Sequence, residues 1–227
     1  MALVSMAMSL AVTSTYFWLF AVPAGPGDYA ISVFAPALIA TPICVWLFLK
    51  IEQIHEAYAH LDVIASTDWL TQVLNRRAFT TAALESCREP GSRALLVLDV
   101  DHFKKVNDRF GHEAGDEALR RIAARIVATA RAGDLVGRLG GEEFGVLVST
   151  DSAEAASALA DEIRHAVSEV EFTPDGLAWP LTVSVGLAFS RTPTRFDRLF
   201  RAADRALYRA KLAGRDRISL DAPGLAA

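Results

Sequence analysis

Two adjacent glutamates, Glu142 and Glu143, follow a pair of glycines in the stretch RLGGEEFGVLV (residues 138–148). The apolar runs on both sides are typical of β-strands, and a Gly-Gly pair provides the positive φ angles that a tight hairpin turn needs. Neighbouring like charges destabilise one another unless a cation or hydrogen bonds offset them. A solvated hairpin tip with two functionless glutamates explains the stretch equally well, so the rest of the chain must decide.

A second set of carboxylates ends the apolar, β-rich run RALLVLDVD (residues 93–101), which predicts a buried strand. Side chains alternate along a strand, so Asp99 and Asp101 share one face. An acid at the end of a buried strand is costly unless it binds a cation or accepts hydrogen bonds. If this strand lies beside the hairpin, Asp99 faces Glu142 and Glu143, and such hard oxygen ligands suit Mg²⁺. The sequence therefore predicts a magnesium site shared by strand and hairpin.

The segment DHFKKVNDRFGHEAGDEAL (residues 101–119) adds groups that suit a nucleotide. Lys104 follows the strand at once, where a turn offers backbone N–H groups to phosphate. Asn107 and Asp116 flank a Gly-His turn, and an amide with a carboxylate can read the acceptor and the N–H donors of a guanine edge. Taken singly, each of these residues is also explained as an ordinary surface group.

Six elements must position these groups, and their order predicts an α+β fold with a ferredoxin-like βαββαβ core and an antiparallel sheet. After a first helix that begins at the cap residues Ser66, Thr67 and Asp68, we expect a strand at 93–101, a helix at 115–134, hairpin strands at 134–139 and 144–148, a helix at 151–170, a strand at 180–190, a helix at 196–217 and a short strand at 218–220. In the last helix, Lys211 and Arg215 are four residues apart, which predicts one face suited to a polyphosphate.

The front of the chain is apolar. No charged side chain precedes Asp28, and the next one is Lys50. Two apolar blocks of about 20 residues flank a Pro/Gly-rich break, and at ~1.5 Å per residue each is long enough to cross a ~30 Å hydrocarbon layer. We therefore expect a two-helix transmembrane hairpin at 1–49. A cleaved signal peptide is the alternative for the first block, and a buried core helix for the second.

Orientation follows from the basic residues. None precedes Lys50, so the positive-inside rule places everything after it in the cytoplasm, under either interpretation of the first block. Cys44 and Cys87 form neither a disulfide nor a metal pattern, which fits a reducing compartment. The net charge of −4 argues against a general nucleic-acid binder.

A short linker at 50–66 carries an apolar seam. Its residues alternate at steps of three and four, which is the a/d pattern of a coiled coil: Ile51, Ile54, Tyr58, Leu61 and Ala65. We expect a parallel two-stranded coil that joins the membrane to a domain at 67–221, with a tail at 222–227. The alternative is one amphipathic helix packed on its own domain.

The part after the linker resembles the GGDEF domain of diguanylate cyclases, in its GGEEF form. The resemblance covers Asp68 to about Ile218, through DWLTQVLNRRAF, DVDHFKKVNDRFGHEAGDEAL, RAGDLVGRLGGEEF, LTVSVGLAF and ADRALYRAKLAGRDR, in that order. Two departures are small: Gln72 stands where the family often has glycine, and Asp216 where it often has asparagine. The resemblance implies a palm-like domain that condenses two GTP molecules into cyclic di-GMP and releases two pyrophosphates.

The resemblance also implies a role for each matching residue. Mg²⁺, or Mn²⁺ in its place, is expected at Asp99, Glu143 and the Val100 carbonyl. The candidate base for the ribose 3′-hydroxyl is Glu142. The groups expected around the nucleotide are Asn107 and Asp116 on guanine, His112 and Phe103 along the pocket, and Lys104, Lys211 and Arg215 on phosphates, with Lys104 counted among the catalytic groups. Arg131 and Asp134 match the RxxD site that binds cyclic di-GMP as an inhibitor.

The implied protein is a homodimer in the bacterial cytoplasmic membrane. One domain holds one GTP, whose hydroxyl must attack a GTP held by a second copy, so a two-fold pair is required. Two other functions stay open: a non-catalytic receptor that binds GTP or cyclic di-GMP and relays a signal at the membrane, and a different nucleotide cyclase or polymerase-like enzyme on a related fold.

Overall fold

The computed structural model describes residues 2–20, 25, 27–28, 42–53 and 66–221. The chain divides into two compact units, residues 1–64 and 65–227. In the first unit, α1 spans Ala2–Phe20 and residues 42–53 are also helical. None of the helices among these described residues is both long enough and apolar enough to cross a membrane.

The expectations for the front of the chain therefore gain no support from the structure. Much of the second apolar block, residues 29–41, lies outside the described residues, and so does most of the predicted coiled-coil seam, residues 54–65. Of that seam, Ile51 lies in the helical segment 42–53 and is about half exposed.

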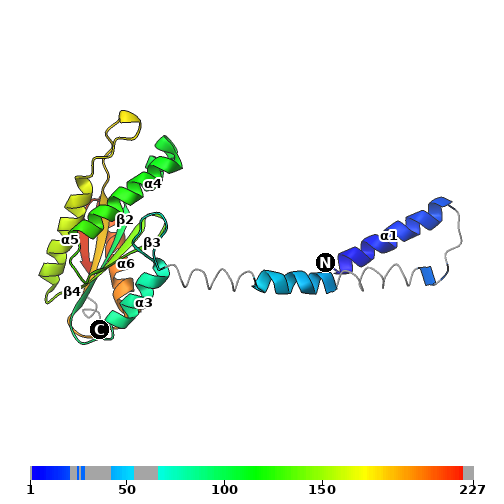
Figure 1. Cartoon of the computed structure of the whole chain (residues 1–227), viewed down its shortest axis with the longest axis horizontal. Helices are drawn as coiled ribbons and strands as arrows, with labels where there is room; N and C mark the ends of the chain where they lie inside the picture. Colours follow the sequence, from blue (N-terminus) through cyan, green and yellow to red (C-terminus); the bar gives the residue numbers. More distant parts are fainter. Residues whose placement is uncertain (1, 21–24, 26, 29–41, 54–65, 222–227) are drawn as a thin grey trace. The chain divides into compact units, whose positions relative to one another are not determined.

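The second unit contains a six-stranded sheet in the order β1-β3-β4-β2-β5-β6 (Figure 1). Its strands are β1 (Leu74–Asn75), β2 (Arg93–Val100), β3 (Leu135–Gly140), β4 (Glu143–Ser149), β5 (Val183–Ser190) and β6 (Ile218–Asp221). The inner four pair antiparallel, which confirms the ferredoxin-like core. The expectation of a wholly antiparallel sheet is wrong, because β1 joins β3 and β6 joins β5 in parallel. The parallel β6 follows from the helix that crosses over between it and β5.

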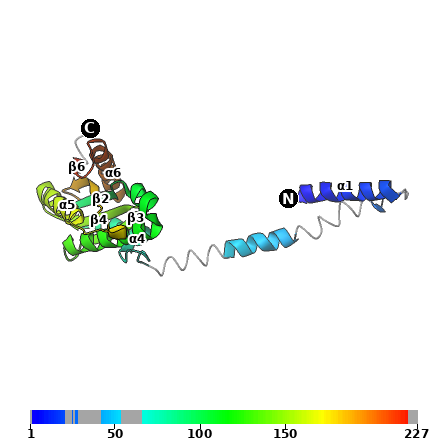
Figure 2. The same ribbon diagram turned by 90° about the horizontal axis from the view of Figure 1, so that it is seen from above.

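Two helices cover each face of the sheet (Figures 1 and 2). On one face, α4 (Phe103–Thr129) and α5 (Ala153–Ser168) pack on one set of β2 side chains, including Leu96 and Leu98. On the other face, α3 (Arg76–Ser86) and α6 (Phe196–Leu212) pack on the alternate set, Leu95 and Val97. Because both faces are covered, every residue of β2 is buried, and the site is built at the end of this strand.

A close contact between α6 and β5 depends on Gly186. A Cβ at this position would overlap the Ala203 carbonyl and the Leu207 backbone nitrogen. The glycine therefore lets α6 lie directly against the sheet. This helix carries Lys211, so its depth on the sheet sets the position of that side chain.

The start of the domain differs from the expectation of a helix at Ser66–Asp68. The Asp68 side chain accepts hydrogen bonds from the Thr71 backbone N–H (2.9 Å) and hydroxyl (2.7 Å), which closes a turn rather than a helix. Gln72 adopts a positive φ of 59°. The helix α3 begins only at Arg76, after Asn75 accepts a hydrogen bond from the Ala78 N–H.

The helix expected at 115–134 is also different. It begins twelve residues earlier, at Phe103, and ends at Thr129. It breaks at Gly111, where φ is 83° and ψ is 168°, so a shorter first segment carries Asn107 and a longer second segment carries Asp116. The residues between Thr129 and β3 form a turn.

Candidate active site

Asp99 and Glu143 lie directly opposite one another on β2 and β4. Opposed residues on antiparallel strands project from the same face, with Cβ atoms about 4.5–5.5 Å apart. The Val100 N–H donates to the Glu142 carbonyl (3.2 Å), which fixes the strand end against the hairpin. The structure therefore confirms that the acid ending the buried strand faces the second glutamate of the hairpin.

The pair is electrostatically unfavourable without a cation. Burial and the nearby charge of Asp99 raise the pKa of Glu143, and the positive charges of Lys211 and Arg76 offset this only in part. Among the described residues, no cluster of three or more His, Cys, Asp or Glu side chains has metal-binding geometry. Two carboxylates beside a strand-end carbonyl, at Val100, fit Mg²⁺, which keeps several water or phosphate ligands of its own.

Lys211 reaches the same carboxylates from α6. Its Nζ lies 2.7 Å from Asp99 Oδ2, and the two side chains are 32% and 13% exposed. Lys211 and Glu143 also line a hollow of about 420 Å³. The other residues lining this hollow all come from α6: Asp204, Arg205, Leu207, Tyr208 and Arg209.

The expectation that Lys211 and Arg215 share a helix face is wrong. The helix ends at Leu212, and Gly214 and Arg215 both have positive φ, 114° and 63°. The Arg215 N–H donates back to the Ala210 carbonyl (3.1 Å), which closes the turn after the helix. A glycine two residues past the helix end was the sequence signal for this stop.

Asp101, which the alternation of the strand placed with Asp99, has a different environment. It is buried and accepts from the hydroxyls of Thr182 (2.9 Å) and Ser184 (2.7 Å) and from the Asp216 N–H (3.0 Å). These bonds satisfy the carboxylate and tie the turn after α6 to the end of β2. Asp101 therefore has a structural role at the end of β2.

The two segments of α4 meet beside a buried polar atom. Asn107 Oδ1 is buried and has no hydrogen-bond partner among the described residues. Gly115, which precedes Asp116, makes room for it, because a Cβ there would overlap that oxygen and crowd the buried Phe103 ring. A buried acceptor without a partner is the kind of group that a ligand donor satisfies. Asn107, the residue predicted to read guanine, thus has a buried oxygen that is available to a ligand donor, and its role stays a prediction.

Lys104 and His112 are both exposed on α4. Lys104 lies in the first turn of the helix, where free backbone N–H groups and the helix dipole favour phosphate. His112 directly follows the break at Gly111.

The tip of the hairpin is held by Arg138, whose role the sequence analysis missed. Its Nε and Nη2 donate to the Gly141 carbonyl (2.9 and 2.7 Å), and its Nη1 donates to Asp68 Oδ1 (3.1 Å). Gly140 and Gly141 have φ of 155° and 45°, as the turn prediction requires. The signal available was the arginine in RLGGEEF, but no spacing rule links it to Asp68, 70 residues earlier.

Arg131 and Asp134 lie together in the turn between α4 and β3. The Arg131 N–H donates to Asp134 Oδ2 (2.8 Å), and the Asp134 N–H donates to the Arg131 carbonyl (3.0 Å). The Arg131 side chain is exposed. The turn thus presents an arginine to solvent beside a fixed carboxylate.

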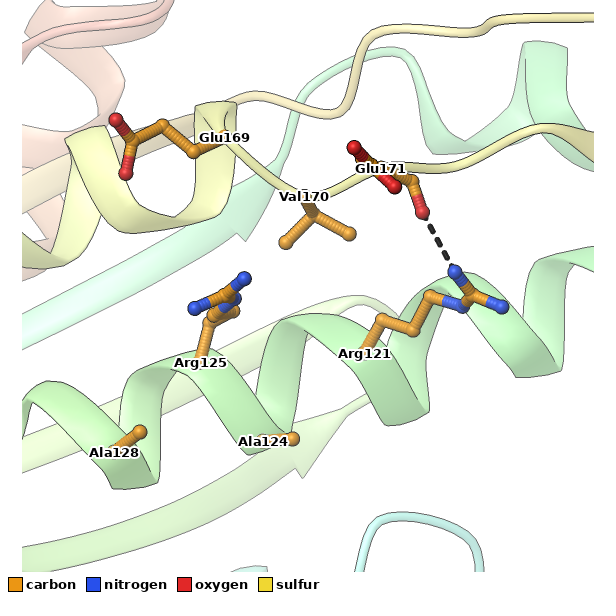
Figure 3. Close-up of a pocket in the computed structure, with 7 residues that line it drawn as sticks. All are labelled: Arg121, Ala124, Arg125, Ala128, Glu169, Val170 and Glu171. Atoms are coloured by element: carbon orange, nitrogen blue, oxygen red, sulfur yellow. Dashed lines mark hydrogen bonds between the residues drawn. The ribbon is translucent and has the colours of Figure 1, made fainter.

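A larger hollow of about 550 Å³ lies between α4 and the residues that follow α5 (Figure 3). Arg121 closes one end of it by donating to the Glu171 carbonyl (2.6 Å). The lining residues are Arg121, Ala124, Arg125, Ala128, Glu169, Val170 and Glu171. None of them belongs to the predicted site.

Curated relatives match most of this chain. It is 40% identical over 160 residues to the diguanylate cyclase DgcP of Pseudomonas aeruginosa, covering 69% of this chain and 24% of that protein. It is 32% identical over 194 residues to the probable diguanylate cyclase DgcC of Escherichia coli, covering 82% and 52%. The chain thus spans about a quarter to a half of the length of these two relatives.

Solved structures agree with this match. The coiled coil and GGDEF domain of DgcB from Caulobacter crescentus, in complex with c-di-GMP, is 29% identical with a TM-score of 0.65, covering 81% of this chain and 98% of that chain. The active GGEEF domain of a Vibrio cholerae diguanylate cyclase is 30% identical with a TM-score of 0.58, covering 66% and 98%. Residues 65–217 match the family described as "Diguanylate cyclase, GGDEF domain", and the chain therefore belongs to the GGDEF-domain diguanylate cyclase family.

Proposed function

We propose that this protein is a diguanylate cyclase of the GGEEF form, which condenses two GTP molecules into cyclic di-GMP and releases two pyrophosphates. The observation that carries the proposal is the placement of Asp99 directly opposite Glu143 on neighbouring strands. Its relatives include the diguanylate cyclases DgcP of Pseudomonas aeruginosa and DgcM of Escherichia coli. The receptor alternative is disfavoured because both hairpin glutamates, Glu142 and Glu143, are present.

Each group of the site has a role in the proposed reaction. Asp99, Glu143 and the Val100 carbonyl would hold Mg²⁺, which supplies Lewis-acid activation at the α-phosphate. Glu142 accepts the proton of the ribose 3′-hydroxyl as that oxygen attacks the α-phosphate of the other GTP. Pyrophosphate is the leaving group, and its charge is balanced by cationic groups.

The remaining groups hold the nucleotide in place. Asn107 and Asp116 bind the guanine edge, with His112 and Phe103 along the pocket, and Lys104, Lys211 and Arg215 bind phosphates. Holding both reactants in line converts a bimolecular encounter into a step within one complex.

The active unit is a homodimer. Each domain holds one GTP, and the two bonds of the cyclic product form by reciprocal attack across a two-fold axis. The linker at 50–66 would tether two copies and so raise their effective concentration.

The turnover assay tests the proposal. The full chain is incubated with GTP and Mg²⁺, and cyclic di-GMP is measured by chromatography. We expect product from the wild type and a loss of at least about 100-fold for Glu142→Gln, because general-base catalysis contributes about 10²–10⁴-fold. Equal product from both proteins would reject the role of Glu142, and nucleotide binding without turnover would favour the receptor. A robust product from ATP would instead favour a different nucleotide cyclase.

We further propose that residues 1–49 anchor the protein in the bacterial cytoplasmic membrane, with the catalytic domain in the cytoplasm. The support is the sequence, which has no charged side chain before Asp28 and no basic one before Lys50. Membrane fractionation and protease treatment of spheroplasts test this. Recovery of the chain in the soluble fraction, or digestion of the catalytic domain from outside, would contradict it.

Product inhibition at Arg131 and Asp134 is also a proposal. Its support is the exposed arginine beside a fixed carboxylate in the turn after α4, and the cyclic di-GMP in the structures of the DgcB domain. We expect Arg131→Ala to relieve inhibition by added cyclic di-GMP without abolishing synthesis, measured as initial rates over a product titration. Inhibition unchanged in the variant would remove the site from the proposal.

A further inference from the structure

We propose that Lys211 acts as an internal cation at the metal site: without nucleotide it pairs with Asp99 and opposes metal binding, and a bound triphosphate draws it away. The inference rests on the proposed function, because it concerns the same carboxylates. It predicts that the metal and the nucleotide bind cooperatively through one lysine.

The contact itself is short and partly shielded from solvent. Lys211 Nζ lies 2.7 Å from Asp99 Oδ2, and the carboxylate side chain is only 13% exposed. In the described part of the chain, this is the one ion pair that Asp99 makes. The neighbouring Ser184, opposite Asp99 on β5, donates its hydroxyl to Asp101 instead. An ammonium is thus the group that neutralises the metal-binding carboxylate.

A metal and this ammonium compete for the same oxygen. Mg²⁺ and Mn²⁺ bind carboxylate oxygens directly, whereas Oδ2 is here paired with the Lys211 ammonium. Binding the metal at Oδ2 therefore requires the ammonium to move away from Asp99. Without an anionic ligand nearby, the displaced ammonium is solvated by water and gains no new ion pair. The cost of breaking this pair lowers the metal affinity of the nucleotide-free protein.

A triphosphate changes this balance. Lysine carries a compact charge on a flexible four-carbon stem, and Lys211 lies in the last turn of α6, beside the hollow that Glu143 also lines. A phosphate in this hollow offers the ammonium a new anionic partner, so releasing Asp99 no longer leaves the lysine unpaired. Coupling between two ligands is reciprocal, so the same contact must also make nucleotide binding depend on the metal.

The experiment must separate the general effect of a nearby positive charge from the specific effect of the Lys211–Asp99 ion pair. Removing any nearby positive charge strengthens cation binding to some extent, and Arg76 provides the matched control. Its charge acts on Glu143, but it forms no ion pair with Asp99 among the described residues. Arg76→Gln therefore reports the general electrostatic effect, while Lys211→Met reports that effect together with the loss of the competing ion pair with Asp99.

The experiment titrates the full-length, nucleotide-free protein with Mn²⁺ and follows free Mn²⁺ by electron paramagnetic resonance. We expect Lys211→Met to bind Mn²⁺ about tenfold more tightly than wild type, a factor near the lower end of what close charge pairs supply. We expect Arg76→Gln to change the affinity less than about twofold, and Lys211→Arg to stay close to wild type. Asp99→Asn should abolish the gain in the Lys211→Met background, which places the metal at this carboxylate.

A second titration adds a GTP analogue with a methylene group between its α- and β-phosphates, which cannot release pyrophosphate. In the wild type, the analogue should tighten Mn²⁺ binding, and in Lys211→Met this coupling should shrink by about the same factor as the nucleotide-free gain. Thermal melting of each variant checks that it is folded.

The inference is overturned if Lys211→Met binds Mn²⁺ no more tightly than wild type, if Arg76→Gln gains as much, or if Asp99→Asn leaves the gain intact. None of these measurements depends on turnover. A chain that forms no cyclic di-GMP yet shows the tightened binding supports the inference while rejecting the proposed function. A working cyclase without the tightened binding does the reverse.

Discussion

Individual residues of the site differ in whether their polar groups are satisfied. Asp101 accepts three hydrogen bonds and serves the fold. By contrast, Asn107 Oδ1 is buried without a partner among the described residues, and Glu143 has a raised pKa because of burial and the charge of Asp99. A buried acceptor without a hydrogen bond and a carboxylate beside a like charge both destabilise the folded protein. Such groups are common at functional sites, where a bound ligand provides the missing partner. The contrast separates the supporting carboxylate from the residues expected to meet substrate and metal.

Gly115→Ala should weaken guanine recognition. The added Cβ would overlap Asn107 Oδ1 and force that side chain away from its present position. We expect the KM for GTP to rise about tenfold with a smaller change in kcat, since one hydrogen bond to the base is worth on the order of 1.5 kcal/mol. Steady-state kinetics measure this, with the exposed Glu113→Ala on the same helix as the control. A KM equal to that of the control would contradict the role of Asn107.

At the scale of the elements, the catalytic hairpin is held from a distant part of the chain. Arg138 connects the Gly141 carbonyl at the hairpin tip to Asp68 in the first turn of the domain. That turn pairs further with the start of α3, since the Asn75 N–H donates to the Ser66 carbonyl. Asp68 lies two residues after the linker, so Arg138 connects the first residues of the domain to the hairpin tip.

The Asp68 contact should make stability depend on pH. Burial raises the pKa of Asp68, but hydrogen bonds from Thr71 and the hydrogen bond and charge of Arg138 outweigh it, and the pKa is lowered overall. A lowered pKa in the folded state stabilises the protein above the ordinary Asp value near 3.9, and this contribution is lost as pH falls through the folded value.

Asp68→Asn should therefore lower the Tm by about 3 °C at pH 7. The difference from wild type should narrow below about pH 4, where the Asp68 carboxylate of the unfolded wild-type chain begins to be protonated. Melting curves across this range measure it, with the exposed Asp151→Asn as the control. A difference that is constant with pH would show that the ion pair with Arg138 is not its source.

The contact of α6 with the sheet gives a second prediction at this scale. Gly186→Ala would place a Cβ against the Ala203 carbonyl and the Leu207 nitrogen. Overpacking of this kind costs about 1–3 kcal/mol, so urea denaturation should show a lower midpoint. Leu212→Ala, at an exposed position on the same helix, should shift the midpoint by less than about 0.5 kcal/mol. Equal midpoints for Gly186→Ala and wild type would mean that α6 moves away at no cost.

At the scale of the whole molecule, the proposed reaction requires two copies of the site. In the described residues, one domain presents Asp99 opposite Glu143 and, at Asn107, the buried oxygen that we expect to read one guanine. Forming two phosphodiester bonds between two nucleotides therefore needs a second domain. In the proposal, the unit at 1–64 tethers two copies and the unit at 65–227 carries out the chemistry.

Mixing wild type with an excess of Glu142→Gln should replace part of the cyclic product with a linear dinucleotide. In a hybrid dimer only one 3′-hydroxyl is activated, so one bond forms and the linear dinucleotide that retains a 5′-triphosphate accumulates. Chromatography of products against the mixing ratio measures this, with Glu113→Ala as the control partner. Cyclic product falling only in proportion to the wild-type fraction, without linear dinucleotide, would contradict the reciprocal mechanism.

The sequence was sufficient for what depends on local patterns. Apolar runs and amphipathic spacing predicted the strands and helices of the core in order. The acids ending the strand at 93–101 predicted that this strand lies beside the hairpin, and the register of Asp99 opposite Glu143 confirms that placement. Predictions from local patterns were wrong at two places where a turn formed instead of the expected helix. Asp68 closes a turn instead of capping a helix, and Gly214 ends α6 before Arg215.

Only the tertiary structure decided the contacts between residues far apart in sequence. Three contacts depend on how α6, the hairpin and the two segments of α4 pack: Lys211 with Asp99, Arg138 with Asp68, and Asn107 with Gly115. No periodicity encodes such pairs, because each is fixed by the depth and angle at which whole elements meet. The sequence by itself therefore identified the charged and polar groups of the site, and the packing of the elements determined which of those groups neutralise one another.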